Sequence, residues 1–354
     1  IKAKPLFGSG PNTFVTQWVT YRPADIITTV FWNTDFTNGI GLIPTFAVTT
    51  GVVGMLSWLL FFGFYLYVGV KSLFVRLDDS FMKYLLASSF FVSLYLWILT
   101  FAYVPSPAIF ILTFFFTGLF FASIYVAGII SVVPKKFSAN PRTGFISSLI
   151  IVVFFVGGVA LGYGLFGNSL SLWYFQKSSF ALNTTKDSKL SEEYMLKAID
   201  TVLSDVYYRA LSDIELFRLN EVLSQDAKKV TQEEVKKQFN DILTKAITAS
   251  KNAVEADKTN YLNHISLGKV YEAVSVPQLN IQGAYESAGL AYQEALRLNP
   301  KNPGILMLFA RLAINRNDLK LAESFALQAI QLKNNYLDAY YILSQIEVAT
   351  QNIQ

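Results

Sequence analysis

The sequence contains no cysteine and a single histidine, His264, in 354 residues. The lack of cysteine excludes disulfides, thiolate metal sites and cysteine nucleophiles. Charge is also scarce, since 15% of the residues are Asp, Glu, Lys or Arg, whereas a soluble domain is usually about a quarter charged. Hydrophobic residues reach 53%, and 30 residues are Phe. These values exclude an ordinary soluble protein for the whole chain.

Glutamate is missing from the first half of the chain. Residues 1–167 contain nine Lys or Arg, four Asp and no Glu, whereas residues 168–354 contain the other twenty basic and twenty-one acidic residues. The net charge is therefore +5 in the first half and −1 in the second. Because the basic residues of the second half alternate with acids, the sequence predicts no nucleic-acid partner. It also predicts no metal site and no cofactor.

Four apolar segments are each long enough to cross a bilayer, which takes about 20 helical residues. They run roughly over Thr45–Val70, Tyr84–Val104, Ala108–Val133 and Phe145–Phe166. The third is apolar on every face, as expected of a helix that faces lipid. The sequence therefore predicts a multi-pass membrane protein with the bilayer as a partner.

The basic residues predict how these spans are oriented. The connections at residues 71–83 and 134–144 each hold three Lys or Arg, and the turn around Pro105 holds no charge. Since basic loops stay in the cytoplasm, both basic connections are predicted to be cytoplasmic. Four spans then place residues 1–44 and residues 168–354 on the outer side of the plasma membrane.

A repeat of 34 residues runs through the end of the chain. Ala295 recurs as Ala329 at that spacing, at a second-helix position of a tetratricopeptide repeat. Small residues let antiparallel helices touch, while aromatic residues such as Tyr292 fill the gaps between repeats. The sequence resembles this family over about residues 240–350. The resemblance implies stacked helix pairs in which Ala253, Ala295 and Ala329 are buried.

The repeat pattern also predicts where an insertion lies and what role His264 has. Between Tyr271 and Ala288 the spacing is eight residues too long, which predicts an inserted loop around Val274–Gln282. His264 falls at a large-residue position of a first helix, so we expect it to have a packing role.

The resulting fold prediction is an all-α chain, a polytopic transmembrane helix bundle followed by an α-solenoid of tetratricopeptide-like helix pairs. The predicted regions are an extracytoplasmic loop segment at 1–44, a region of four spans at 45–167, a diverged helical repeat region at 168–239 and tetratricopeptide-like repeats at 240–354. A chain that opens at Ile1, with no Met and no leader, is expected to be part of a longer protein.

Residues 1–55 carry the motifs that suggest chemistry. Residues 5–14 read PLFGSGPNTF, which resembles the Gly-x-Gly-Pro segment in the large external loop of the O-antigen ligase and polymerase superfamily. That superfamily also has a His, a small polar residue, nine residues and then Gly-x-x-Gly at the start of a span. Gly51 and Gly54 match the glycines, while Ile40 stands where the His belongs and Gly41 where the polar residue belongs.

The resemblance implies a type C glycosyltransferase that moves a glycan from a polyprenyl pyrophosphate to an acceptor without a metal. Such a transfer needs a cation at the pyrophosphate and a base at the acceptor. By side-chain type, Arg22 and Lys4 are the candidate lipid-pyrophosphate-binding residues, and Asp35 is the candidate catalytic base. Ordinary surface ion pairing is the alternative for all three.

Three aromatic residues of the same stretch, Trp18, Tyr21 and Trp32, are candidates for stacking on sugar rings. An aromatic belt at the membrane interface is the alternative.

Two functions follow from these patterns. The first is a membrane protein of surface-glycan handling that binds polyprenyl-linked glycan, lacks the family His, and binds a protein partner on the repeat groove. The second is a catalytically inert membrane scaffold that acts through its repeats. Whether the chain is an enzyme stays open at this point.

Overall fold

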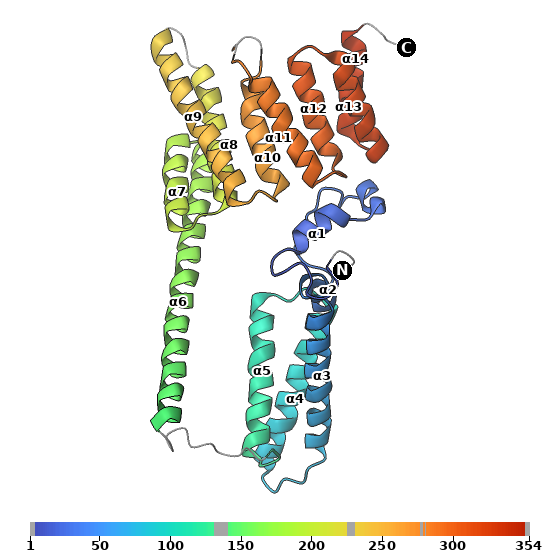
Figure 1. Cartoon of the computed structure of the whole chain (residues 1–354), viewed down its shortest axis with the longest axis vertical. Helices are drawn as coiled ribbons and strands as arrows, with labels where there is room; N and C mark the ends of the chain where they lie inside the picture. Colours follow the sequence, from blue (N-terminus) through green and yellow to red (C-terminus); the bar gives the residue numbers. More distant parts are fainter. Residues whose placement is uncertain (1–3, 131–140, 225–230, 277–278, 280, 351–354) are drawn as a thin grey trace. The chain divides into compact units, whose positions relative to one another are not determined.

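The computed structural model describes residues 4–130, 141–224, 231–276, 279 and 281–350 (Figure 1). The residues within these ranges form helices and no strand, which confirms the all-α prediction. The chain divides into two compact units. The first, which we call the apolar-helix unit, comprises residues 1–22 and 34–144, and the second, the repeat unit, comprises residues 23–33 and 145–354.

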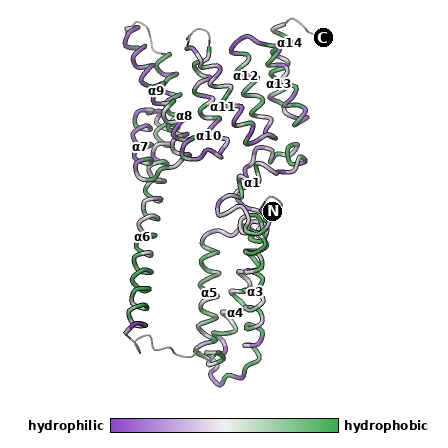
Figure 2. The backbone as a smooth tube through the Cα atoms, in the orientation of Figure 1, coloured by the Kyte–Doolittle hydropathy of each residue, from purple (hydrophilic) through white to green (hydrophobic). Residues whose placement is uncertain are grey.

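The apolar-helix unit contains five complete helices. They are α1 (Phe14–Tyr21), α2 (Leu42–Thr49), α3 (Gly51–Leu73), α4 (Ser80–Ala102) and α5 (Pro107–Val126). Helices α3, α4 and α5 are long and apolar enough to cross a membrane, as is the segment Gly144–Thr185. Figure 2 shows the hydrophobic colouring that runs along these helices. The count of four apolar helices agrees with the prediction.

Aromatic rings fill the core of the apolar-helix unit. Trp97 is 1% exposed, and Tyr65 and Phe120 are 0% exposed. The polar atoms among them are satisfied, since Trp97 Nε1 donates to Thr117 Oγ1 at 3.0 Å and Tyr65 Oη donates to the Phe90 carbonyl at 3.2 Å. A buried polar group without a partner is costly, so these bonds let α3, α4 and α5 pack closely.

The predicted spans differ from the helices at their ends, as in the second, which was expected over Tyr84–Val104 and is α4 at Ser80–Ala102. The first was expected from Thr45, but α3 begins at Gly51, which has a φ of +64° and separates it from α2. The third was expected to reach Val133, but α5 ends at Val126 and Gly128 has a φ of +67°. Residues 131–133 lie outside the described ranges. At Gly51 and Gly128 a left-handed glycine conformation ends the helical path.

Helix α6 (Pro141–Phe180) carries the fourth apolar segment and continues beyond it. The prediction ended this span near Phe166, whereas the helix runs on without a break to Phe180. Its last part packs against α7 (Ser188–Thr201), where Ser171 Oγ donates to the Ala198 carbonyl at 3.0 Å and Ser178 Oγ donates to the Ser191 carbonyl at 2.7 Å. The fourth apolar segment and the first helix of the solenoid are therefore one helix.

The solenoid continues as antiparallel helix pairs. Its helices are α8 (Asp205–Leu223), α9 (Gln232–Ala256), α10 (Tyr261–Ala273), α11 (Ala284–Leu298), α12 (Pro303–Asn315), α13 (Leu319–Leu332) and α14 (Leu337–Ala349). Ala253, Ala295 and Ala329 are each 0% exposed, as predicted. A Cβ atom added at Gly268 would lie 2.3 Å from the Tyr292 ring. The small residues therefore do what the resemblance implied, because they let neighbouring helices and an aromatic ring approach closely.

The irregular positions of the repeat also agree with the prediction. Residues 274–283 connect α10 to α11, where the inserted loop was expected, although residues 277, 278 and 280 lie outside the described ranges. His264 is 8% exposed, and its Nε2 atom lies 3.0 Å from the Lys258 carbonyl oxygen. This contact supports the turn before α10, which is the packing role expected for His264.

Candidate functional site

The two glycine motifs of the sequence meet in the apolar-helix unit. Gly8 has a φ of +69°, and a Cβ atom there would lie 2.4 Å from the backbone carbon of Thr49. The amides of Ser9 and Gly10 donate to the carbonyls of Val48 and Thr49, each at 2.9 Å. The segment that contains Gly-x-Gly-Pro therefore lies directly on the junction of α2 and α3.

The same segment provides hydrogen-bond acceptors for the first amides of α3. The amides of Val52 and Val53, which begin a helix and so lack partners within it, donate to the carbonyls of Pro5 at 2.9 Å and Leu6 at 3.1 Å. A Cβ atom at Gly51 would lie 2.6 Å from the Leu6 oxygen. We call this interlocked arrangement of residues 4–13 with residues 48–54 the glycine junction. The amides of Ser9, Gly10, Val52 and Val53 are thus used within the protein.

The hydroxyl groups of the glycine junction also bond to one another. Thr13 Oγ1 donates to the Gly10 carbonyl at 2.7 Å and lies 2.6 Å from Ser9 Oγ, which in turn donates to the Val48 carbonyl at 3.1 Å. The sequence indicated a motif with a role in chemistry. In the structure, its polar groups hold the loop on the start of an apolar helix.

The position that the family gives to histidine lies close to this junction in the sequence. Ile40 is 84% exposed. The next residue, Gly41, has a φ of +79°, and a Cβ atom there would lie 2.0 Å from the Phe101 carbonyl oxygen at the end of α4. Gly41 is therefore required by close backbone contact, while Ile40 leaves an apolar side chain in an exposed position.

The other candidates of the apolar-helix unit have different surroundings. Trp18 Nε1 donates to the Thr34 carbonyl at 3.0 Å, and the indole packs edge to face on Phe36 with 5.0 Å between ring centroids. Arg22 is 1% exposed, whereas Tyr21 is 64% exposed. Lys4 is exposed and Asp35 is partly buried. Trp18 is therefore held in place by the protein.

Trp32 belongs to the repeat unit, together with the rest of residues 23–33, which we call the docked segment. Its ring packs on Tyr336 with 5.1 Å between centroids, and the Lys333 ammonium lies 5.9 Å from the Trp32 ring centroid. Lys333 Nζ donates to the Ile27 carbonyl at 3.0 Å, and Asn335 Nδ2 donates to the Thr28 carbonyl at 3.2 Å. The sequence suggested Trp32 for sugar stacking and did not predict this contact with the last repeat.

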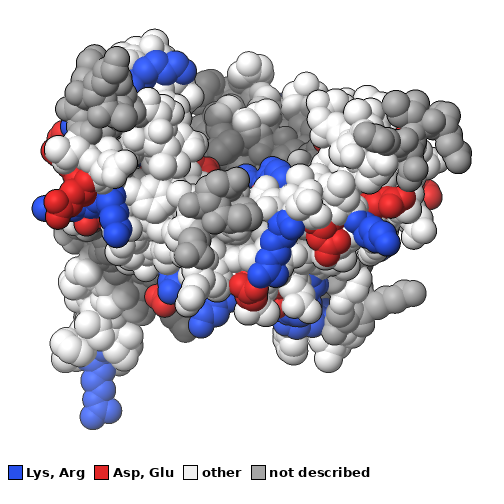
Figure 3. Space-filling view, turned by 90° about the horizontal axis from the view of Figure 1, so that it is seen from above, with Lys and Arg blue, Asp and Glu red and all other residues white. Residues whose placement is uncertain are grey.

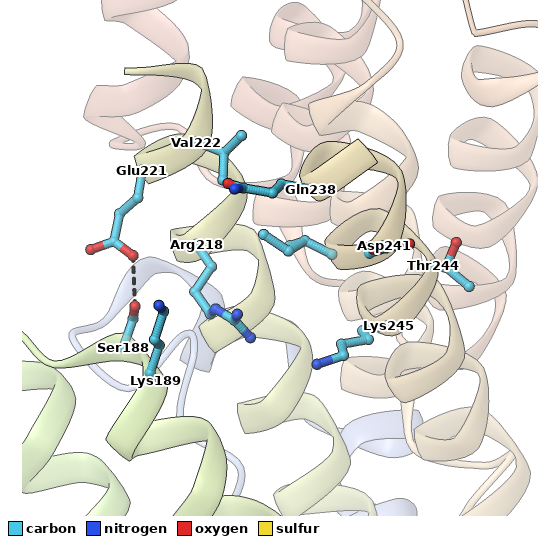
Figure 4. A pocket seen from close by; sticks show the side chains of 10 residues that line it. Ser188, Lys189, Arg218, Glu221, Val222, Gln238, Asp241, Thr244 and Lys245 are labelled. Carbon is cyan, nitrogen blue, oxygen red and sulfur yellow. Dashed lines mark hydrogen bonds between the residues drawn. The ribbon is translucent and has the colours of Figure 1, made fainter. Parts of the chain in front are cut away.

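A cavity of about 700 Å³ lies among α7, α8 and α9 (Figure 4). It is lined by Ser188, Lys189, Arg218, Glu221, Val222, Gln238, Asp241, Ile242, Thr244 and Lys245. Ser188 Oγ donates to Glu221 Oε2 at 2.6 Å, the bond drawn in Figure 4. The lining is mixed in charge, so the cavity has no single preference for an anion or a cation.

A cluster of charges adjoins this cavity. Arg218 donates to Glu192 and to both carboxylate oxygens of Glu215, the latter at 3.1 Å each, while Lys245 Nζ lies 2.5 Å from Glu192 Oε1. Glu215 is 1% exposed. Burial, reinforced by the negative charge of Glu192 and opposed by Arg218, raises the pKa of Glu215 to about 7. Glu215 therefore holds its proton to a higher pH than an exposed glutamate does.

A second charged cluster links three consecutive repeat helices. Glu272 on α10 is 6% exposed, and it accepts hydrogen bonds from Tyr292 Oη on α11 and from Arg311 on α12, the Nη2 contact measuring 2.9 Å. Burial, with the adjacent Glu272 carboxylate, raises the pKa of Tyr292, and the hydrogen bond from Arg311 to Glu272 raises the pKa of Arg311. This cluster connects α10, α11 and α12 through the Glu272 carboxylate.

Sequence reasoning missed both clusters and the docked segment, although two of the three carried a signal. Glu272 is the one acidic residue in 261–273, and Lys333 stands where the preceding repeat has Asn299. Within the described ranges, no group of three or more His, Cys, Asp or Glu is arranged to hold a metal ion. On the face shown in Figure 3, Lys and Arg lie beside Asp and Glu.

Comparisons with known proteins add little to this geometry. No protein-family model matches the chain. A "Sol locus transcriptional repressor" of Clostridium acetobutylicum is 32% identical over 84 residues, which are 24% of this chain and 26% of that protein. The chain thus spans about a quarter of the length of this curated relative.

One solved structure found to be similar is a thermophilic TPR protein of Thermus thermophilus. It is 16% identical, with a TM-score of 0.41, and the match covers 57% of this chain and 96% of that one.

The class of the repeat unit is clear from its own helix pairs and alanine packing. It is a tetratricopeptide-like helical repeat, an architecture whose stacked pairs form extended surfaces suited to binding proteins.

Proposed function

We propose that this chain is a membrane-anchored scaffold of surface-glycan handling that binds a protein partner on its outward-facing repeats. The observation that carries the proposal is the continuity of α6, which runs from an apolar segment of spanning length into the first helix pair of the solenoid. With no flexible linker between them, a bilayer around the apolar part of α6 would hold the repeats at the membrane surface. A rigid attachment of this kind suits a protein that presents partners at a membrane.

The proposed location is the plasma membrane, with the repeats outside the cell. The docked segment precedes the first apolar helix, yet it contacts the last repeat turn, and such a contact requires both to be on one side of a bilayer. Four spans between them satisfy that requirement. The basic connections at residues 71–83 and 134–144 supply the direction, because basic loops stay in the cytoplasm.

This topology can be tested with single cysteines, because the chain has none of its own. A membrane-impermeant maleimide applied to intact cells is expected to label a Glu193→Cys variant on α7. It is expected to leave an Asp78→Cys variant, in the connection between α3 and α4, unlabelled until the membrane is opened. The positive control is labelling of both variants in detergent. The opposite pattern in intact cells would show that the repeats face the cytoplasm.

A second candidate function, transfer of a lipid-linked glycan, is favoured by the glycine junction, which unites both glycine motifs of the family resemblance. In this proposal Arg22 and Lys4 bind the pyrophosphate of a polyprenyl-linked glycan. Asp35 takes the proton of the acceptor, and Trp18, Tyr21 and Trp32 stack on sugar rings. The chemistry is general base catalysis with electrostatic stabilisation of the leaving group.

Three observations favour the scaffold over the transferase. Ile40 offers no base at the histidine position, Arg22 is 1% exposed, and the polar groups of the glycine junction bond within the protein. A transferase would need a base at the position of Ile40, an accessible Arg22 for the pyrophosphate, and polar groups in the glycine junction that are free to bind substrate. The repeats, in contrast, present their outer faces without rearrangement.

Replacing Asp35 distinguishes the two candidates. If Asp35 is the base, an Asp35→Asn variant is expected to lose about 10²- to 10⁴-fold in glycan transfer, measured with a polyprenyl-pyrophosphate glycan and candidate acceptors. Asp25→Asn is the matched control, since Asp25 is the other carboxylate of this stretch and is exposed. The scaffold proposal expects no turnover from any of the three proteins. Equal, robust turnover by all of them would contradict both the Asp35 proposal and the scaffold.

A further inference from the structure

Three turns of the solenoid are equivalent by structure. Asp257, Asn299 and Lys333 each end a second helix, and their amides donate to the carbonyls of the buried alanines Ala253, Ala295 and Ala329 respectively. Three residues later, Asn260, Asn302 and Tyr336 each precede the next first helix. The equivalence allows each turn to serve as a control for the others.

The first two turns follow the local rules of helix capping. Asn260 Oδ1 accepts from the Leu262 amide at 3.1 Å, and Asn302 Oδ1 accepts from the Gly304 amide at 2.9 Å. Asn is among the residues preferred at this position, because its side chain satisfies an amide that the helix leaves open. The Asn302 side-chain amide also donates to Asn33 Oδ1 of the docked segment at 3.5 Å, but the caps themselves are made within the repeats.

The third turn, at residues 333–336, differs from the first two in its cap residue and in a buried lysine. Tyr336 makes no side-chain cap for α14 and is 7% exposed. Lys333 is 6% exposed, although burying an ammonium group is costly unless it is hydrogen-bonded. The local preference would be Asn at the cap position of Tyr336 and, as in the first two turns, an uncharged or acidic side chain in place of Lys333.

The docked segment accounts for both exceptions. The Lys333 ammonium donates to the Ile27 carbonyl at 3.0 Å and to Asn335 Oδ1 at 2.7 Å, and Tyr336 receives the Trp32 ring. Ile27, at the centre of the segment, is 3% exposed. Residues that depart from the local preference and make contacts with a distant segment indicate a surface shaped for that segment.

We propose that the turn at residues 333–336 is a docking site for the chain's own loop, residues 23–33. Lys333 and Asn335 recognise backbone carbonyls, and Tyr336 recognises the indole of Trp32. The solenoid is then attached at both ends, at the first through α6 and at the last through the docked segment. A protein bound to the last repeat would thereby be coupled to the loop. The inference does not depend on which of the two proposed functions is correct.

Cysteine accessibility in the full-length, detergent-solubilised protein tests the docking site. An Ile27→Cys variant is expected to react slowly with a small maleimide, and adding Lys333→Met is expected to speed the reaction at least about tenfold, because a hydrogen bond to a charged group is lost. Lys320→Met is the matched control, an exposed lysine at the start of the same helix α13. Val30→Cys, whose parent side chain is 85% exposed, should react fast in every background.

A second variant guards against a general loss of folding. Asn335 is exposed, and Asn335→Asp removes its donor to the Thr28 carbonyl while it keeps the oxygen that accepts from Lys333. This variant is therefore expected to leave the melting temperature of the protein nearly unchanged while it speeds the labelling of Ile27→Cys. Fast labelling of Ile27→Cys in the parent protein would overturn the proposal. So would a rate that neither Lys333→Met nor Asn335→Asp increases.

Discussion

An Arg311→Met variant is expected to lose about 1 to 3 kcal/mol of stability in the repeat unit. The substitution removes the ion-pair partner of the Glu272 carboxylate, which is 6% exposed, and leaves it the hydrogen bond from the Tyr292 hydroxyl. A buried acceptor that loses its charged partner costs about this much, and the half-exposed Arg311 side chain keeps the loss below that of a fully buried pair. Urea titration followed by far-ultraviolet circular dichroism measures the loss.

Replacing the acid instead, as Glu272→Gln, should cost less stability, and this difference tests whether the unpaired Glu272 charge causes the loss in Arg311→Met. In Glu272→Gln the amide oxygen can still accept from Tyr292, and Arg311, whose side chain is 51% exposed, can return to water. Combining both substitutions should recover most of the stability lost in Arg311→Met, since no buried charge is left. An Arg311→Met loss that the second substitution does not reduce would contradict the unpaired-charge explanation.

A surface pair provides the control for this experiment. Arg297 and Glu294 on α11 form an ion pair with side chains 65% and 37% exposed. Pairs of this kind contribute about 0.2 to 1 kcal/mol, so Arg297→Met should fall within that range. A similar loss in Arg297→Met and Arg311→Met would mean that burial does not distinguish the two pairs.

The stability of the repeat unit is expected to depend on pH through Glu215. Burial and the adjacent Glu192 raise its pKa from 4.5 to about 7 in the folded protein. The native state therefore holds this proton more tightly than the unfolded chain. The corresponding stabilisation is fully present below the unfolded value and is lost as the pH rises through about 7, with a total change of up to roughly 3 kcal/mol.

A Glu215→Gln variant isolates this contribution, because glutamine is similar in size and does not titrate. Its stability relative to the parent is expected to increase steadily between about pH 4.5 and pH 7 and then to level off. Glu233→Gln, at an exposed position in the first turn of α9, should change this dependence little. Parallel stability curves for Glu215→Gln and the parent over that range would show that Glu215 does not titrate near neutrality.

Local patterns in the sequence were sufficient to predict the elements. Runs of apolar residues without charge indicated four helices of spanning length. The 34-residue recurrence of alanine indicated the helix pairs, with Ala253, Ala295 and Ala329 buried as expected. Both are patterns of side-chain size and polarity along one helix, and the energy that selects them, burial of apolar surface, depends little on distant residues.

The two glycine motifs show what the local sequence patterns could not predict. Gly51 was expected to open an apolar helix, and it does, but the helix cannot extend back to Thr45 because the loop at Leu6–Gly8 lies against it. The motif at residues 5–14 suggested chemistry, whereas its donors hold the loop on α3. The spacing of a motif along the chain does not show which distant backbone segment its amides will bind.

The sequence by itself therefore determined the class of each element, the repeat period and the buried alanines, because these follow from periodicity within single helices. Only the tertiary structure decided that α6 joins an apolar segment to the solenoid, that Lys333 holds the loop at Ile27, and that Glu215 and Glu272 are buried among charges. Each of these depends on groups that are far apart in the sequence and meet only after folding. A charged or aromatic residue looks the same in sequence whether water or another segment of the chain satisfies it.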